Sequence, residues 1–242
     1  MFNSQDNPVL TALQQGQISI QGEFLWGSNY TFSTQVAYQE RLLPAVYKPI
    51  RGERPLWDFP RASLARREVA AYLVSEALGW RFVPPTVYRQ DGPAGAGSLQ
   101  LYIEHDPQCN YFNISEQDRQ RLRPVVLFDL LINNADRKGS HILFDNDRKI
   151  WLIDHGICFH TDYKLRTVIW DFAGERIPED LCLALSQLPE QLAPQTGLFE
   201  CLQEYISREE IRALGKRAER LLKSGRFPDP HPSRRPYPWP PV

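Results

Sequence analysis

The strongest constraint on this 242-residue chain is a pair of apolar runs that each end in an acidic residue within a polar, glycine-marked loop. The first run, which ends at Ile132, leads to Asp136, and the second, residues 150–153, leads to Asp154. Two carboxylates presented in this way are the usual equipment for metal-assisted chemistry on phosphate. We therefore expect a fold that brings these two loops to one site.

Composition sets the class of protein. The chain is 42% hydrophobic and 12% aromatic, which allows a sizeable core. Its 28 Lys and Arg residues nearly balance its 29 Asp and Glu residues, so there is no basic footprint for nucleic acid. The four cysteines lack the paired spacing of a zinc site, and no run approaches the roughly 20 apolar residues of a membrane span. These features favour a cytoplasmic protein with no nucleic-acid partner and no membrane span.

The first half of the chain carries five strand-like patterns around one helix pattern. Three of these strand-like segments precede the helix and two follow it. Ser63 is the expected N-cap of the helix, and Gly79 ends it. The expected strands are residues 18–24, 30–38, 42–50, 82–88 and 98–103.

The second half is mainly helical. Ser115 opens a first helix, but Pro124 would break its interior, so a second helix is expected to open near Pro124. Ser207 and Glu210 form a capping box for the last helix, which should end near Gly225. The other expected elements are strands 141–144 and 149–153 and helices 178–188 and 197–205.

The last sixteen residues contain seven prolines together with Tyr237 and Trp239, a composition that favours an extended polyproline conformation. Such a tail can lie across the body of the protein, or it can dock another protein or chain. These patterns divide the chain into an arm, two lobes and a tail. The expected boundaries are 1–17 for the arm, 18–106 for the first lobe, 107–226 for the second lobe and 227–242 for the tail.

Five strands and one helix, followed by a helical lobe with two loop carboxylates, form the layout of a bilobal phosphotransferase. Segments 136–141 (Asp-Arg-Lys-Gly-Ser-His) and 154–156 (Asp-His-Gly) resemble the Asp-Arg-His-x-x-Asn and Asp-Phe-Gly segments of the kinase-like superfamily that includes the phosphatidylinositol 3- and 4-kinases and other atypical kinases. The chain is more closely similar to a bacterial kinase-like group with an Asn-Asn-x-Asp-Arg-Lys-Gly segment. The resemblance covers residues 18–225. It implies an α+β, bilobal protein-kinase-like fold, with an antiparallel sheet and one helix in the N-lobe and a mainly helical C-lobe.

The resemblance also implies the roles of four side chains in the ATP-dependent transfer of a γ-phosphate. Asp136 would be the base or the hydroxyl-orienting group, and Asp154 would bind Mg²⁺. Lys48, on the third expected strand, would contact the α- and β-phosphates and be held by Glu68 from the helix. From the residues alone, Asp136 could instead form an ion pair with Arg137, and Asp154 could cap a strand end.

By the same resemblance, the nucleotide lies between the lobes. Ser28 and Asn29, at the tip of the first expected hairpin, would close over the phosphates, although the same residues also suit an ordinary turn. The adenine would lie against the backbone near Glu104 and His105. These assignments make ATP the expected cofactor, together with a divalent ion.

His141 departs from the superfamily pattern, because it stands where the superfamily has an Asn for the second metal ion. A neutral imidazole prefers softer ions than Mg²⁺, so Mn²⁺ is a second candidate ion. Three roles are open for His141: it could bind a metal together with Asp154, contact phosphate, or point into the core. Asn133 and Asn134, just before Asp136, could support the loop through bonds from their side chains to the backbone.

The sequence leaves the chemical class of the acceptor open. Lys164 and Arg166, in the segment after Asp154, give a positive spot suited to an anionic acceptor. That segment has no membrane-seeking amphipathic stretch, which favours a protein or a small molecule over a membrane lipid. Two alternatives to a kinase also remain: a pseudokinase that acts as a nucleotide-binding regulatory module, and an AMP transferase on the same scaffold.

Overall fold

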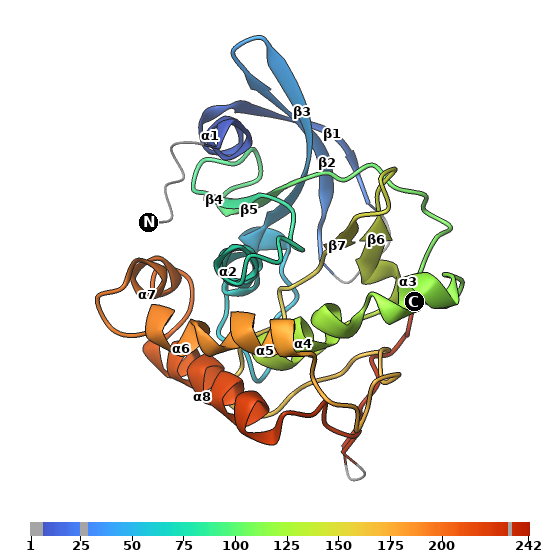
Figure 1. Cartoon of the computed structure of the whole chain (residues 1–242). Helices are drawn as coiled ribbons and strands as arrows, with labels where there is room; N and C mark the ends of the chain where they lie inside the picture. The colour runs from blue at the N-terminus through green and yellow to red at the C-terminus, as the bar shows by residue number, and fades with distance from the viewer. Residues whose placement is uncertain (1–6, 25–28, 232–233) are drawn as a thin grey trace.

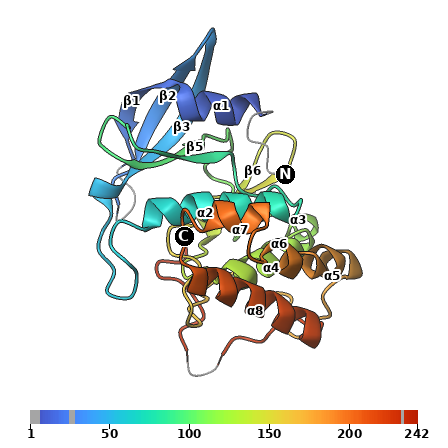
Figure 2. The same cartoon turned by 90° about the vertical axis from the view of Figure 1, so that its left-hand side faces the viewer.

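The computed structural model describes residues 7–24, 29–231 and 234–242, which form two lobes (Figure 1). The first lobe contains a five-stranded antiparallel sheet in the order β1-β2-β3-β5-β4. The second lobe is mainly helical, and helix α2 (Leu64–Ala77) lies between it and the sheet in both cartoon views (Figure 2). The strands are β1 Gln17–Glu23, β2 Phe32–Tyr38, β3 Arg41–Pro49, β4 Thr86–Arg89 and β5 Gly97–Leu101. The α+β, bilobal architecture expected from the sequence is confirmed.

A short helix, α1 (Pro8–Gln15), packs against the sheet and was not predicted from the sequence. Its N-cap residue, Asn7, accepts hydrogen bonds from two amides of the first turn. The Arg89 guanidinium of β4 donates to the carbonyl of Leu13 at 2.8 Å and ties the helix to the sheet. The arm expected at residues 1–17 therefore contributes a helix to the first lobe.

Helix α2 covers the predicted residues, but a different side chain caps it. Ser63 holds the predicted N-cap position, yet its hydroxyl donates to the carbonyl of Pro60 at 2.6 Å and makes no capping bond. The amide of Ala65 donates to a carboxylate oxygen of Glu53 at 2.8 Å, so the cap comes from the preceding loop. At the other end, Gly79 has φ +70° and the helix stops before it, as predicted.

Strand β4 is shorter than the sequence pattern predicts. The expected strand spanned residues 82–88, but pairing begins only at Thr86. Pro84 and Pro85 cannot donate to a strand ladder, which explains the late start. The amides of the two residues before these prolines donate instead to the Ser75 hydroxyl of α2.

The second lobe follows the predicted order of elements, with one addition. Its elements are α3 Glu116–Gln120, α4 Arg123–Ile132, β6 Ile142–Phe144, β7 Ile150–Leu152, α5 Glu179–Ser186, α6 Leu188–Gln191, α7 Gly197–Leu202 and α8 Arg208–Ser224. Pro124 lies in the first turn of α4, and α8 has the predicted capping box of Ser207 and Glu210. Helix α6 was not predicted separately. Among the described residues, the helices all fall short of the length and apolar character that a membrane crossing takes.

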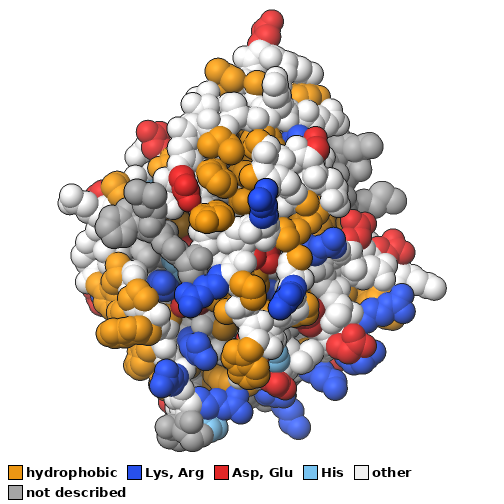
Figure 3. All heavy atoms as spheres, turned by 180° about the vertical axis from the view of Figure 1, so that it is seen from behind, with side chains coloured by type: hydrophobic (Ala, Val, Ile, Leu, Met, Phe, Trp, Pro, Cys, Tyr) orange, Lys and Arg blue, Asp and Glu red, His pale blue; other side chains and the backbone are white. Residues whose placement is uncertain are grey.

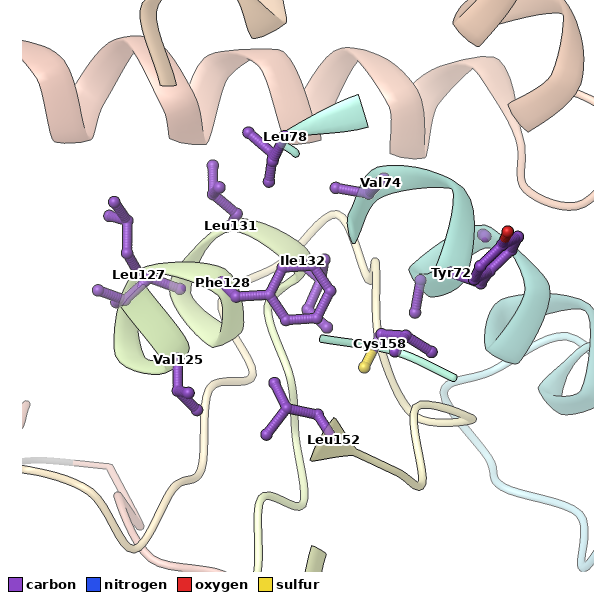
Figure 4. Packing of buried hydrophobic residues seen from close by; sticks show 14 of the residues in the cluster. Tyr72, Val74, Leu78, Val125, Leu127, Phe128, Leu131, Ile132, Leu152 and Cys158 are labelled. Atoms are coloured by element: carbon purple, nitrogen blue, oxygen red, sulfur yellow. The ribbon is translucent and has the colours of Figure 1, made fainter. Parts of the chain in front are cut away.

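An apolar core lies beneath the two carboxylate loops. Figure 4 shows Phe128 and Ile132 of α4 packed with Val74 of α2 and Leu152 of β7, all of them buried. Helix α4 leads into the Asp136 loop, and β7 leads into the Asp154 loop. Both loops therefore begin at closely packed elements, which is the condition for holding a site rigidly.

Candidate active site

Three side chains from elements far apart in the sequence meet at one point. Lys48 of β3 places its Nζ 2.6 Å from Glu68 Oε1 of α2 and also contacts Asp154 Oδ1 after β7. Although burial alone acts in the opposite direction, the carboxylates of Asp154 and Glu68 raise the pKa of Lys48. The ammonium is therefore charged and joins the sheet, α2 and the Asp154 loop.

Helix α2 is held in the orientation that points Glu68 toward Lys48. The neighbouring residue, Arg67, is buried and pairs with Glu210 of α8 at 2.6 Å. A second nitrogen of Arg67 donates to the carbonyl of Cys158, in the segment after Asp154, also at 2.6 Å. These bonds join α2 to the second lobe on the side of the helix next to Glu68.

Asp154 adopts a left-handed backbone with φ +61°, a conformation that is uncommon for a residue with a side chain. Its second oxygen lies 3.2 Å from His141 Nε2, and 43% of the side-chain surface is exposed. Although desolvation raises it, the pKa of Asp154 is held well below its usual range, chiefly by the Lys48 ammonium. The carboxylate is thus ionised, oriented and open to a ligand.

His141 is buried, as a core position would require, but its Nε2 faces Asp154 and therefore the candidate site. It lies at the end of a short 3-10 turn, Gly139–His141, just before β6. Burial lowers the pKa of His141 to about 4, so the ring is neutral near pH 7. Nδ1 accepts a long hydrogen bond from the Lys138 amide at 3.5 Å, which leaves the proton on Nε2 to be donated to Asp154.

Asp136 lies in the loop that follows α4. Its amide donates to the Asn134 side-chain oxygen at 3.0 Å, and its side chain is 29% exposed. Burial raises the pKa of Asp136 to about 6, against the opposing effect of the Lys138 ammonium 3.8 Å away. A carboxylate with a pKa in this range is suited to accept a proton near neutral pH.

Arg137 does not pair with Asp136, so the sequence-based alternative of an ion pair between them is wrong. The Arg137 guanidinium lies 2.9 Å from Asp129 of α4, and both side chains are almost completely buried. Asp129 interrupts an otherwise apolar run, and a buried carboxylate of this kind needs a cationic partner. This pair was not predicted from the sequence, although the place of Asp129 within an apolar run was the available signal.

The remaining nitrogens of Arg137 join the two carboxylate loops. One donates to the carbonyls of His141 and Ile153, at 3.2 and 3.0 Å. Another lies 2.8 Å from His155 Nε2, which must accept because a guanidinium only donates. Burial holds the pKa of His155 well below its usual range, in keeping with a neutral ring. Arg137 therefore fixes the relative position of the loops that carry Asp136 and Asp154.

The two asparagines before Asp136 support the loops, as predicted. The Asn133 side-chain nitrogen donates to the carbonyls of His160 and Asp162, and its oxygen accepts from the Lys164 amide. Asn134 donates to Asp129 at 2.9 Å. Asn133 itself ends α4 in a left-handed conformation with φ +55°. Its side chain therefore ties the Asp136 loop to the segment that follows Asp154.

The residues predicted to contact the nucleotide come from separate segments of the chain. Ser28 lies outside the described residues. Asn29 accepts a hydrogen bond at 2.7 Å from the amide of Arg54, in the loop before α2, so one of its acceptor sites is already used. Glu104 and His105 lie in the connection between β5 and α3 that joins the lobes, with Glu104 exposed and His105 half-buried. The adenine position there stays a prediction.

Of the two cations predicted to attract an anionic acceptor, Lys164 and Arg166, the first is already paired. Lys164 pairs with Asp58 at 3.1 Å and lies 5.1 Å from the centre of the Trp57 ring, so its charge is partly neutralised. Arg166 is exposed, and its positive charge acts to lower the pKa of Asp136, against the larger effect of burial. Figure 3 shows further Lys and Arg side chains gathered over the lower half of one face. Lys138, which was not singled out from the sequence, places its ammonium 3.8 Å from Asp136.

The donor set suits a divalent ion that takes most of its ligands from a nucleotide. Within the described ranges there is no group of three or more His, Cys, Asp or Glu side chains placed to hold an ion. Asp154 offers one carboxylate, with the neutral ring of His141 beside it. Mg²⁺ is usually bound through one or two carboxylates together with substrate phosphates and water, so the Asp154 carboxylate is sufficient for a nucleotide-bound ion.

No protein-family model matches the sequence. Protein Rv2133c of Mycobacterium tuberculosis is 40% identical in an alignment 263 positions long, gaps included, which covers 94% of this chain and 93% of that protein. The chain belongs to the family of protein Rv2133c. Phosphatidylinositol 4-kinase gamma 4 of Arabidopsis thaliana is 30% identical in an alignment 131 positions long, gaps included, which covers 44% of this chain and 23% of that protein.

Among solved structures, the Helicobacter pylori proinflammatory kinase CtkA aligns with a TM-score of 0.54. The alignment covers 88% of this chain and 94% of that chain, at 12% sequence identity. This likeness concerns the fold, and it confirms the kinase-like architecture inferred from the two loop segments.

Proposed function

We propose that this protein is a phosphotransferase that uses ATP with Mg²⁺ or Mn²⁺ and transfers the γ-phosphate to a hydroxyl group. The observation that carries the proposal is the convergence of Lys48, Glu68 and Asp154 beside a second loop carboxylate, Asp136. Phosphoryl transfer needs neutralisation of the polyphosphate charge and orientation of the nucleophile. Lys48, held by Glu68, would neutralise phosphate charge directly, and Asp154 would do so through a bound ion. Asp136 would orient the nucleophile. The Asn-Asn-x-Asp-Arg-Lys-Gly segment further supports membership of the similar bacterial kinase-like group.

Lys48 would change partners when the nucleotide enters. Its ammonium is shared between Glu68 and Asp154 in this structure. A nucleotide-bound ion would supply charge neutralisation at the phosphates, and Asp154 would hold it. Lys48 would then turn from Asp154 to a phosphate oxygen while Glu68 keeps its position. His141 could join as a ligand only if its proton moves from Nε2 to Nδ1, which costs the bond from the Lys138 amide.

Asp136 would orient the acceptor hydroxyl and take its proton. Its pKa of about 6 leaves the carboxylate mostly ionised at neutral pH and still basic enough to accept a proton. Lys138, whose ammonium lies 3.8 Å from Asp136, would stabilise negative charge on the group being transferred. The acceptor itself is proposed as a protein or a small molecule.

A second candidate function, a nucleotide-binding regulatory module without transfer, is favoured by one observation. His141 stands at the superfamily's second-metal position and donates to Asp154, which engages one of the oxygens that a metal would use. A module of this kind would bind ATP and leave the γ-phosphate intact. AMP transfer, the third possibility, differs in the mass added to the product.

Binding of ATP by the purified chain, with Mg²⁺ and with Mn²⁺, tests the first step. We expect calorimetric binding that is lost in Asp154→Ala and kept in Asp147→Ala, an exposed carboxylate in the β6–β7 turn. Absence of binding with both ions, or equal binding by the two variants, would overturn the proposal. Mass spectrometry of the product then separates a gain of phosphate from a gain of AMP.

A further inference from the structure

The C-terminal segment, residues 234–242, lies along the backbone beside the proposed base. The Gly139 amide, three residues after Asp136, donates to the carbonyl of Pro241 at 2.8 Å. The Thr167 amide donates to the carbonyl of Pro236 at 2.9 Å. We call these two donors, Gly139 and Thr167, the amide ledge. Main-chain N–H groups that donate to the carbonyls of an extended segment are typical of peptide recognition in which the peptide adds as a strand.

The amide ledge is itself assembled from two segments far apart in the sequence. The Arg137 amide donates to the carbonyl of Arg166 at 3.0 Å, and the Val168 amide donates back to Arg137 at 3.1 Å. Arg137 and Thr167 thereby form a parallel bridge that joins the two segments carrying the ledge. The tail therefore lies as an outer layer on a surface that is complete without it.

Little holds the tail apart from its carbonyls. Pro238 is buried, but Tyr237 and Trp239 are 55% and 89% exposed. Arg234 anchors the near end, because it donates to the carbonyl of Tyr163 at 3.0 Å and lies 4.9 Å from the centre of that ring. Prolines cannot donate and are already extended, so the segment loses little conformational freedom on docking.

The site does not depend on the tail for its position. The catalytic loop is fixed from within by Arg137, through Asp129 and the carbonyls of His141 and Ile153. Removal of the tail frees the amides of Gly139 and Thr167 and the indole N–H of Trp170, which donates to the carbonyl of Pro236 at 3.3 Å, and it leaves the bonds of Arg137 intact. The tail can therefore leave while the loop geometry persists. A segment that only completed the fold would be expected to carry more buried side chains.

We propose that the amide ledge is a docking groove for an extended, proline-containing polypeptide, and that the tail is its resident occupant. An acceptor polypeptide that approaches Asp136 along this ledge has to displace residues 234–242, whereas a small acceptor does not. The groove itself is independent of the proposed phosphotransfer, and only the relation to the acceptor rests on that function.

The groove is tested with a chain that ends at His231 and a synthetic peptide of residues 234–242. The shortened chain keeps Phe227, which is buried, and its thermal unfolding should stay close to that of the full chain. We expect the peptide to bind the shortened chain at least about tenfold more tightly than the full chain, because a tethered tail competes at an effective concentration on the order of millimolar. Absence of binding to a folded shortened chain, or equal binding to both chains, overturns the proposal.

Two peptide variants give the matched control. Pro238→Lys should abolish binding because Pro238 is buried, whereas Trp239→Ala should keep it because that ring is exposed. Loss with both or with neither counts against the observed docking mode.

If the shortened chain fails to fold, amide hydrogen exchange in full-length Pro238→Lys replaces it. Faster exchange at Gly139 and Thr167 is expected, and unchanged exchange overturns the proposal. None of these measurements contains ATP, so failure of phosphotransfer leaves their outcome unaffected.

Discussion

Replacement of Asp136 by Asn should abolish phosphotransfer and at the same time stabilise the fold. The pKa of Asp136 is about 6 in the folded protein, against an ordinary value of 3.8. Each pKa unit corresponds to about 1.4 kcal/mol, so the ionised carboxylate destabilises the fold by up to about 3 kcal/mol. Because the side chain is 29% exposed, solvent screening reduces the effect to about 1–2 kcal/mol. Asn has nearly the same shape and carries no charge to desolvate.

The sign of the effect depends on pH. Since the folded state holds the Asp136 proton more tightly than the unfolded state, this proton stabilises the fold below about pH 4, and the contribution is lost as the pH rises through about 6. The Asn variant should therefore exceed the native protein in free energy of unfolding at pH 8 and approach it at pH 4. Urea unfolding at the two pH values measures this difference.

Asp154→Asn is the matched control, because the pKa of Asp154 is held below its usual value. That variant should be less stable than the native protein at pH 8, since the Lys48 ammonium loses one of its two carboxylate partners. If the native protein and Asp136→Asn have the same free energy of unfolding at pH 8, burial does not destabilise the Asp136 carboxylate. If they differ by the same amount at pH 4 as at pH 8, the difference does not come from the Asp136 charge.

Three further predictions concern the same loops. Arg137→Met should lower the free energy of unfolding by about 3–5 kcal/mol in urea titrations, because it leaves Asp129 charged and buried without a partner; a loss below about 1 kcal/mol would contradict the central position of Arg137. In the native protein, kcat/KM for phosphotransfer should rise with pH around pH 6 as Asp136 loses its proton, and a profile that is flat from pH 5 to 8 would exclude Asp136 as the base. His141→Asn should shift the ratio of activities toward Mg²⁺ over Mn²⁺, because an amide oxygen replaces the imidazole; an unchanged ratio would remove His141 from the metal site.

Local sequence signals were sufficient for most of the fold. The capping box of Ser207 and Glu210 and the glycine at Gly225 set both ends of α8, and these signals lie within one turn of the ends they define. Pro124 correctly separated α3 from α4. In contrast, the cap of α2 comes from Glu53, which lies outside the local pattern and could be found only from the folded loop.

The site was predictable in its acidic residues and less so in their partners. Lys48 and Glu68 pair as the resemblance implied, but the direct contact of Lys48 with Asp154 was not foreseen. Adjacency in the sequence made Arg137 look like a partner of Asp136. The backbone turns between them, and the guanidinium reaches Asp129 in the core instead. Ion pairs across a core depend on tertiary geometry that no local pattern carries.

Phosphotransfer by this protein is tested by following the γ-phosphate of ATP in a single turnover with excess protein and Mn²⁺ or Mg²⁺. We expect loss of the γ-phosphate to an acceptor or to water. This loss should disappear in Asp136→Asn and in Asp154→Ala and persist in Asp147→Ala. Tight binding of ATP with an intact γ-phosphate in the native protein would contradict the account and identify a nucleotide-binding module.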